Sequence, residues 1–351
     1  MLSRAFTKPK RSPRGGESSL RSTASICEYD EDFMVGFMDD IPLISFDEYN
    51  DSCNSRVNSN KVVAGSYINQ SPNSSESTRM MTLRQVLRAS VGVMGESPLG
   101  MTEKVVLLGG KICAVKRFRR VGIRKREFGR RIERVAQVGN QCEFLVPVTA
   151  YLYAKRIKFV VCDYYPMGTL ADLLSGAREQ GHTALEWKHR FKIVQGLAKA
   201  IAYIHSQNPP REKHLQLNLH GNIKSSNVMI DIDFTARLSD YGFVQLADQV
   251  EVDDTGQAEL PTTPSPERAS VVTISQESDI YNFGMVLMDI LGWPKVSLGV
   301  EKVDLFEFCV EGKEKKQAFK ILDIALSCTN SLPDARPTIE QILCCLGEHV
   351  K

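Results

Sequence analysis

The spacing of hydrophobic and polar positions changes part-way along this 351-residue chain. Short β-rich runs, bounded by glycine-containing turns, are predicted at 104–108, 111–118 and 156–163. A helical pattern interrupts them at 127–138. After Gly168, apolar residues recur every three to four positions, which predicts amphipathic helices at 187–205, 278–291, 315–328 and 339–347. The pattern therefore predicts an α+β fold with a small β-rich lobe at 82–165 and a larger helical lobe at 166–349.

The first 81 residues have a composition typical of disordered chains, and it changes in three zones. Residues 1–25 contain six Lys or Arg and one acidic residue. Residues 28–51 contain nine Asp or Glu and no Lys or Arg, with aromatic and aliphatic residues between the acids. Residues 52–77 are rich in Ser and Asn. We therefore predict a disordered N-terminal region at 1–81.

Cysteine usage and hydropathy favour a cytoplasmic protein. The nine cysteines form no C-x-x-C pair and no metal-ligand spacing, as expected of reduced thiols. No segment has the roughly 20 consecutive apolar residues that cross a bilayer. The basic N-terminal zone fits a disordered tail, a nuclear-type basic cluster or an organelle transit peptide, while the lack of Gly at position 2 excludes N-myristoylation. A net charge of +2 gives no reason to expect a nucleic-acid partner.

Candidate chemistry lies in four motifs with a fixed order. The run His220–Asn227, HGNIKSSN, resembles the catalytic loop H-R-D-L-x-x-x-N of protein kinases, and Asp240-Tyr241-Gly242 is a variant of the metal-binding D-F-G. Upstream, Gly95-x-Ser97-x-x-Gly100 stands in the position of a glycine-rich loop. Lys116 ends a predicted strand, as the phosphate-binding lysine of kinases does. Each motif alone is weak evidence, and their order and spacing carry the argument.

Further segments complete the resemblance. Ser265-Pro266-Glu267 takes the place of A-P-E, and the runs at 278–284 and 334–337 match the large lobe of kinases. The chain resembles, over residues 82–349, the kinase domain of plant leucine-rich-repeat receptor-like kinases. The HGN triplet and the run DYYPMGTL at 163–170 point to their atypical HGN-type branch. The repeats and membrane span of those receptors are absent from this sequence, so we expect a cytoplasmic protein, either free or peripheral at the plasma membrane.

The resemblance implies roles for individual residues. It implies ATP binding by the glycine-rich loop, the strand lysine and the hinge, at Gly95, Ser97, Gly100, Lys116, Cys162, Asp163 and Tyr165. It implies Mg²⁺ ligation by Asn227 and Asp240, whose oxygens suit that cation. Structural contacts are implied for a Lys116–Glu133 ion pair, a Glu267–Arg336 ion pair, and an aspartate, Asp279, that braces the catalytic loop. The catalytic positions are those of Asn222 and Lys224.

Three departures from the family pattern concern catalysis. Asn222 stands where kinases have the aspartate base, and an amide carries no titratable carboxylate. Gly221 replaces the arginine that binds a phosphorylated activation loop. Ser97-Pro98 interrupts the glycine-rich loop, where proline removes an N–H donor. We therefore expect an inactive or very weak pseudokinase that binds ATP and acts as a scaffold or allosteric partner of active receptor-like kinases. The alternatives are a slow Ser/Thr kinase and a scaffold that needs no nucleotide.

A dense run of positive charge lies in the small lobe. Residues 116–134 contain ten Lys or Arg and only two acids. The run is either a solvated helix face or a docking patch for an acidic partner or an anionic membrane surface. Residues 28–51 of the same chain, being acidic and aromatic, are a local candidate to dock on it.

Overall fold

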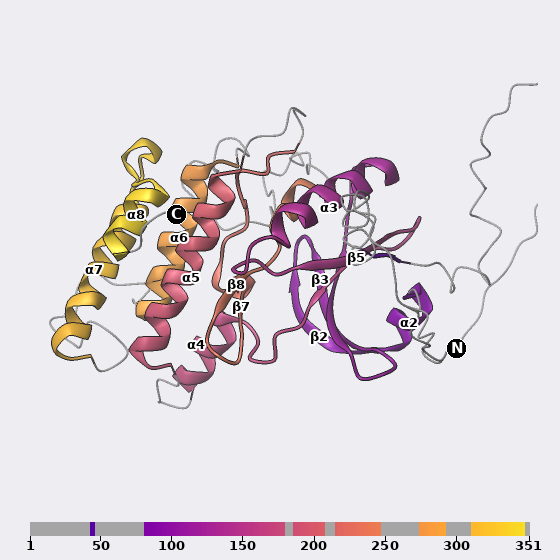
Figure 1. Ribbon diagram of the computed structural model, residues 1–351, viewed down its shortest axis with the longest axis horizontal. Coiled ribbons are helices and arrows are strands. Elements are labelled where there is room, and N and C mark those ends of the chain that lie inside the picture. Colours follow the sequence, from indigo (N-terminus) through magenta and orange to yellow (C-terminus); the bar gives the residue numbers. More distant parts are fainter. Residues whose placement is uncertain are drawn as a thin grey trace, which may run out of the picture. The chain divides into compact units, whose positions relative to one another are not determined.

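The computed structural model of the protein describes residues 43–45, 81–179, 185–207, 215–246, 274–292 and 310–347, and for 177–179 the backbone only. By its contacts the chain divides into Met1–Val35 and Gly36–Lys351, and every described residue belongs to the second unit. In Figure 1 the sheet lies with helices α2 and α3, and helices α4 to α8 lie together beside it. This is the two-lobed arrangement that the sequence pattern predicts.

The small lobe is built on one six-stranded antiparallel sheet. Its strands are β1 (Ile44–Ser45), β2 (Ser90–Ser97), β3 (Gly100–Val106), β4 (Ile112–Phe118), β5 (Val148–Tyr153) and β6 (Lys158–Asp163), in the order β1-β5-β6-β4-β3-β2. Of the region predicted to be disordered, 1–81, the structure describes residues 43–45 and Met81, and Ile44 and Ser45 form a strand. This short edge strand pairs with β5. Its stability comes from this tertiary contact, because its local sequence does not encode a strand.

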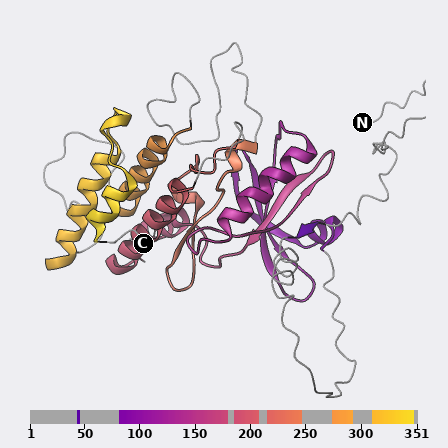
Figure 2. The same ribbon diagram turned by 45° about the horizontal axis from the view of Figure 1, so that its top comes forward.

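Each face of this sheet has its own hydrophobic cluster. Helix α3 (Lys125–Gly139) covers one face (Figures 1 and 2). It buries Phe128, Ile132 and Val135 there. Helix α2 (Leu83–Arg88) and Leu43 pack on the other face, in a cluster with apolar side chains of β3 to β6. Thr82 caps the N-terminus of α2 with a capping box. Its hydroxyl accepts the Gln85 backbone N–H, and the Gln85 side-chain oxygen accepts the Thr82 backbone N–H.

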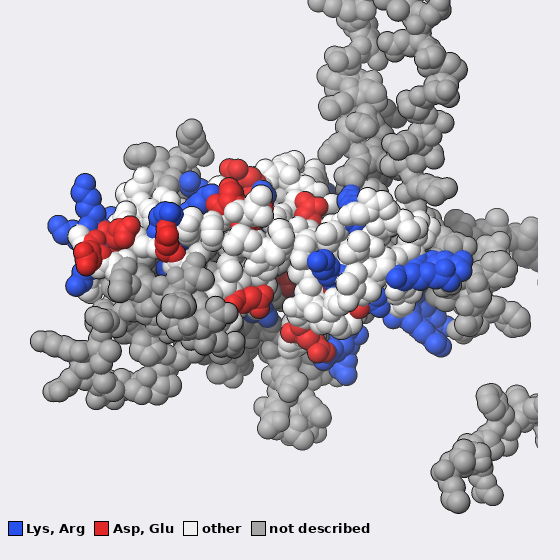
Figure 3. Space-filling model, turned by 90° about the horizontal axis from the view of Figure 1, so that it is seen from below, with Lys and Arg blue, Asp and Glu red and all other residues white. Residues whose placement is uncertain are grey.

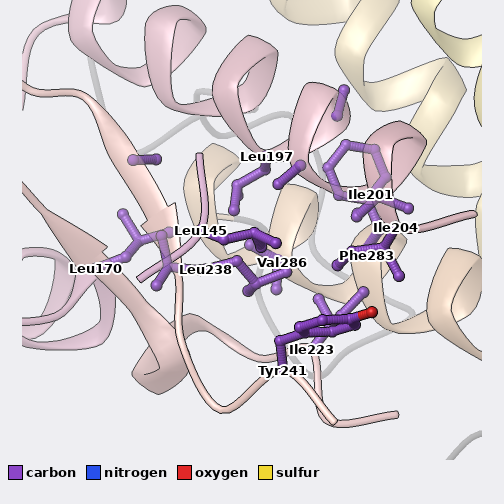
Figure 4. Packing of buried hydrophobic residues seen from close by; sticks show 14 of the residues in the cluster. Leu145, Leu170, Leu197, Ile201, Ile204, Ile223, Leu238, Tyr241, Phe283 and Val286 are labelled. Carbon is purple, nitrogen blue, oxygen red and sulfur yellow. The ribbon is translucent and has the colours of Figure 1, made fainter. Parts of the chain in front are cut away.

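The large lobe is helical, as its apolar spacing predicts. It contains α4 (Leu170–Glu179), α5 (Trp187–His205), α6 (Gln276–Leu291), α7 (Gly312–Cys328) and α8 (Ile339–Leu346), with the hairpin β7 (Val228–Ile230) and β8 (Ala236–Leu238) and the short 3-10 helices η3 (Ser225–Asn227), η4 (Phe243–Leu246) and η6 (Pro333–Ala335). Side chains of α5, α6 and β8 meet in one core, and Tyr241 packs beside Ile223 at its margin (Figure 4).

The surface distributes charge unevenly between the lobes. Seen from below, Lys and Arg gather toward the small-lobe end, whereas the far end of the large lobe carries both signs (Figure 3). Within the ranges that the structure covers, no helix combines the length and apolar composition that a membrane crossing needs.

Candidate nucleotide site

A pocket of about 780 Å³, open mouth included, lies where the strands of the small lobe face the catalytic-loop segment. It contains several of the predicted site residues: Gly95, Lys116, Cys162, Asp163, Asn227 and Asp240. The sheet supplies the lysine and the hinge, while the loop around η3 and the segment after β8 supply Asn227 and Asp240. The fold thus brings together residues that are up to 145 positions apart in the sequence.

The charged centre of this pocket is an ion pair between the two lobes. Lys116 Nζ donates to Asp240 Oδ2 at 2.9 Å, and both side chains are more than nine-tenths buried. The same ammonium lies 3.4 Å from the Ser97 hydroxyl. Asp240 has φ of +63°, a conformation uncommon outside glycine, and the bond to Lys116 helps to hold it there. One lysine therefore connects the glycine-rich loop, the sheet and the DYG segment.

The predicted Lys116–Glu133 ion pair is not formed, and this expectation is corrected. Glu133 lies on an exposed position of α3 and accepts a hydrogen bond from the Tyr151 hydroxyl at 2.9 Å. Gly129 permits this contact, because a Cβ there would lie 2.7 Å from the same hydroxyl. The lysine's acceptor is Asp240 instead. Both members of the expected pair thus have other partners.

Asp279 on α6 braces the catalytic-loop segment, as the sequence predicts. Its carboxylate accepts the backbone N–H groups of His220 at 2.7 Å and of Gly221 at 2.8 Å, and His205 Nε2 lies 3.3 Å away. Burial opposes ionisation, yet these hydrogen bonds and the neighbouring histidines hold the pKa of Asp279 below its usual value. Gly221 has φ of +80°, and a Cβ would approach Ile274 to 2.9 Å, so an arginine at this position would be strained.

His220 is held as a neutral imidazole. Its Nε2 donates to the Ser239 carbonyl at 2.9 Å, which leaves Nδ1 to accept the Asn222 backbone N–H at 3.1 Å. Complete burial lowers the pKa of His220, and the nearby carboxylates only partly oppose this. The ring therefore connects the catalytic loop to the segment before Asp240 without carrying charge.

Asn222, the residue at the position of the catalytic base, is fully buried. Neither atom of its amide has a hydrogen-bond partner, and the side chain is not among those lining the pocket. Its backbone carbonyl accepts from Asn227 Nδ2 at 2.8 Å, which orients the Asn227 amide. Position 222 thus shapes the loop and places neither a base nor an amide in the pocket.

The glycine-rich loop departs from the predicted role at Gly100. A Cβ at Gly100 would lie 1.8 Å from the Arg117 carbonyl oxygen, so this glycine permits close packing of β3 on β4 and does not line the pocket. Leu99 is buried in the main core. Ser97 contacts Lys116 but is likewise not among the lining residues. Gly95 alone of the three motif positions lines the pocket.

The hinge positions also separate into two groups. Cys162 and Asp163 line the pocket, and burial raises the pKa of the Cys162 thiol, which is therefore uncharged. Tyr165 is buried outside the pocket, beneath the Arg237 guanidinium. Lys224 is half-buried near the Asp240 charge, and burial lowers its pKa. Glu267 lies outside the described residues, so the predicted pair with Arg336 does too.

The profile of the protein tyrosine and serine/threonine kinase family matches residues 95–346. The chain belongs to this kinase family. It shares 33% identity over 291 residues with "Probable inactive receptor kinase RLK902" of Arabidopsis thaliana, covering 76% of this chain and 43% of the relative. The kinase domain is thus related to plant leucine-rich-repeat receptor-like kinases and pseudokinases, and the chain spans about two fifths of the length of the relative that it matches.

Two solved structures share the kinase fold. The pseudokinase domain of BIR2, an immune regulator of the RLK/Pelle family, matches with a TM-score of 0.63 and 24% identity, covering 89% of this chain and 90% of that one. The kinase domain of maize SIRK1 bound to AMP-PNP matches with a TM-score of 0.59 and 23% identity, covering 77% and 97%. At these identities the matches show the fold alone.

Several contacts of this kinase domain were not predicted from the sequence. Thr102, Ser226 and Ser239 line the pocket, and each is close in sequence to a recognised motif, which is the signal that could have located them. Tyr151 gave no such signal, because its role depends on how α3 lies against β5. The basic run at 116–134 is also interrupted, since Lys116 and Arg131 are buried and Arg117 pairs with Glu103.

Proposed function

We propose that this kinase domain is a nucleotide-binding pseudokinase that acts as a scaffold or allosteric partner of active receptor-like kinases. One observation carries the proposal: Lys116, Asn227 and Asp240 meet in one pocket, while position 222 carries a buried amide outside it. Nucleotide binding is thereby supported and proton abstraction is not. The inactive receptor kinases among its relatives agree with this separation.

The loss of the catalytic base supports a strong reduction in the rate of phosphate transfer. General-base assistance typically contributes about 10²–10⁴ in rate, and an amide supplies none of it. Positioning and electrostatics account for much of phosphoryl transfer, so a remnant of activity is compatible with the site. The domain therefore transfers phosphate slowly or not at all, and its biological effect comes from binding.

The pocket suits ATP and Mg²⁺ by the chemistry of its donors. The Lys116 ammonium can bind phosphate oxygens, and the oxygens of Asn227 and Asp240 are the hard ligands that Mg²⁺ takes. Among the described residues no group of three or more His, Cys, Asp or Glu could hold a metal, so phosphates and water would complete the shell. The cation would neutralise phosphate charge. Asp240 must then exchange part of its contact with Lys116 for the metal.

Two other functions have specific support. A slow Ser/Thr kinase is supported by the intact Lys116, Asn227 and Asp240 set with Lys224 close to it. A nucleotide-independent scaffold is supported by two bonds: the Lys116–Asp240 bond satisfies groups that ATP and Mg²⁺ would engage, and the Glu133–Tyr151 bond occupies the carboxylate expected to pair with Lys116.

Thermal shift with ATP, with and without Mg²⁺, separates the nucleotide-binding functions from the scaffold. A ligand that binds only the folded state at 100-fold over its Kd stabilises it by about 2.7 kcal/mol. We expect such a shift in the wild type and its loss in Lys116→Ala. No shift at any nucleotide concentration would support the scaffold instead.

Single-turnover phosphotransfer separates the pseudokinase from the slow kinase. We expect no transfer above a buffer control from the wild type or from Asn222→Asp, because position 222 lies outside the pocket. Transfer by the wild type that disappears in Lys116→Ala would contradict the pseudokinase proposal.

A further inference from the structure

The strand β1 anchors the N-terminal region on the small lobe. Ile44 pairs with Tyr151 and Ser45 with Ala150, antiparallel. Leu43 is only 2% exposed, packs in the cluster under α2, and donates its N–H to the Met81 carbonyl at 2.8 Å. These contacts fix the position of Leu43 on the small lobe.

The described strand β1 points toward the N-terminal end of α3. Because the pairing is antiparallel, the step from Ser45 back to Ile44 runs in the direction of Leu152 and Tyr153 on β5. The Tyr153 hydroxyl donates to the Ile123 carbonyl at 3.0 Å, two residues before α3 begins. The edge of the sheet and the start of α3 are therefore in direct contact at this place.

An unpaired group of cations surrounds this contact. It consists of four exposed side chains, here called the basic turn: Arg120, Arg124, Lys125 and Arg126. None of the four has a hydrogen bond or ion pair to another described residue through its side chain. Cations at a helix N-terminus oppose the helix dipole, which favours negative charge there. The basic turn therefore favours an acidic occupant.

We propose that residues 28–42 of the same chain, here called the acidic segment, dock on the basic turn. The segment carries six acids and no Lys or Arg: Glu28, Asp30, Glu31, Asp32, Asp39 and Asp40. The last two are three and four residues before Leu43, so their backbone reaches about 10–14 Å from the anchor. Reach, direction and opposite charge together select this segment as the occupant, independently of whether the pocket binds nucleotide.

Docking would bear on the nucleotide site through one residue. Ile44 lies opposite Tyr151, and the Tyr151 hydroxyl holds Glu133 away from Lys116. The docked segment therefore restrains β5 and α3 together, in the arrangement in which the Lys116–Glu133 pair is absent.

Carbodiimide cross-linking of the full-length chain tests the docking, because it joins a carboxylate directly to a lysine amine. We expect intramolecular cross-links from the acidic segment to Lys125, mapped by mass spectrometry, and several-fold fewer to Lys111, an exposed lysine at the β3–β4 turn of the same lobe. The yield at Lys125 should fall as salt is raised from about 0.05 M to about 1 M, which shortens the screening length.

Charge variants at exposed positions supply the controls. Arg124→Gln and Arg126→Gln, made singly, should each lower the Lys125 yield, whereas the matched loss of one charge in Arg88→Gln on α2 should leave it unchanged. Leu43→Asp, checked for folding by circular dichroism, should lower it by removing the anchor. Equal cross-linking to Lys125 and Lys111, cross-links only between two molecules, or a yield independent of Arg124 and Arg126 would each overturn the proposal.

Discussion

The burial of the Asn222 amide leads to a quantitative prediction about the stability of the variant Asn222→Asp. Asn222→Asp restores the residue type of an active kinase, and its side chain has nearly the same shape as the amide. The structure places this carboxyl where no solvent reaches it, and no group bonds to the amide that it replaces. An ionised carboxylate without partners is strongly disfavoured in such a place, so we expect the pKa of the introduced carboxyl to rise well above its unfolded value.

The size of the effect follows from proton linkage. With an unfolded pKa of about 3.9, keeping the carboxyl protonated in the folded state at pH 7 costs about 4 kcal/mol. This is an upper limit, because the carboxyl ionises in the folded state if ionisation there costs less free energy than keeping the proton. A raised folded pKa means that the folded state holds the proton longer, so the penalty is absent below about pH 4 and grows as pH rises. For a domain of this size, about 4 kcal/mol lowers Tm by roughly 10 °C at pH 7.

Urea unfolding of wild type, Asn222→Asp and Asn222→Leu across pH tests this reasoning. Asn222→Asp should approach wild-type stability near pH 4 and lose about 3–4 kcal/mol by pH 7. Asn222→Leu is the matched control, because it removes the unsatisfied polar atoms; it should be neutral or stabilising and should show no added pH dependence. Equal stability of Asn222→Asp and wild type at pH 7 would refute the claim that this side chain is buried without partners.

Three further predictions concern other parts of the site. Tyr151→Phe releases Glu133, and we expect a several-fold tighter Kd for Mg·ATP in a thermal-shift titration, with a stability change of only about 0.5–1.5 kcal/mol. Burial lowers the pKa of His220, so the unfolded chain binds a proton first as pH falls below about 6.5. The free energy of unfolding, measured with urea, should therefore fall by up to about 1.4 kcal/mol per pH unit. The variant His220→Gln should remove this pH dependence. Gly100→Ala places a Cβ against a backbone oxygen and should lower the free energy of unfolding by more than about 2 kcal/mol, whereas Gly95→Ala, with open space around it, should change it by less than about 1 kcal/mol; a similar effect of both would contradict the assigned packing role.

The large lobe was the part of the fold most accessible from sequence. The predicted helix at 187–205 has the bounds of α5, Trp187–His205, because ten of its residues are buried and their spacing records the helical period. Strand β1 escaped prediction because two residues carry no periodicity, and their pairing depends on an edge that β5 offers only in the folded lobe.

The site was predicted as a set of residues better than as a set of contacts. Motif spacing placed Lys116 and Asp240 in one pocket, but it did not predict that they pair with each other, because no motif records that Glu133 bonds to Tyr151 instead. Gly100 shows the same limit, since a glycine required for strand packing and one required for phosphate binding look identical in sequence. Burial also removed Lys116 and Arg131 from a basic run that appeared continuous.

The hydrogen bond from Leu43 to Met81 has a consequence for tolerance to insertion. The bond closes residues 44–80 into a loop whose two ends are held together by the cluster under α2. Closure entropy rises only with the logarithm of loop length, so doubling the loop costs about 0.6 kcal/mol. Length changes in this loop are thus nearly neutral for the kinase fold. The pairing of β1 with β5 does not depend on that length, so insertions between Ser45 and Met81 should be tolerated by the domain.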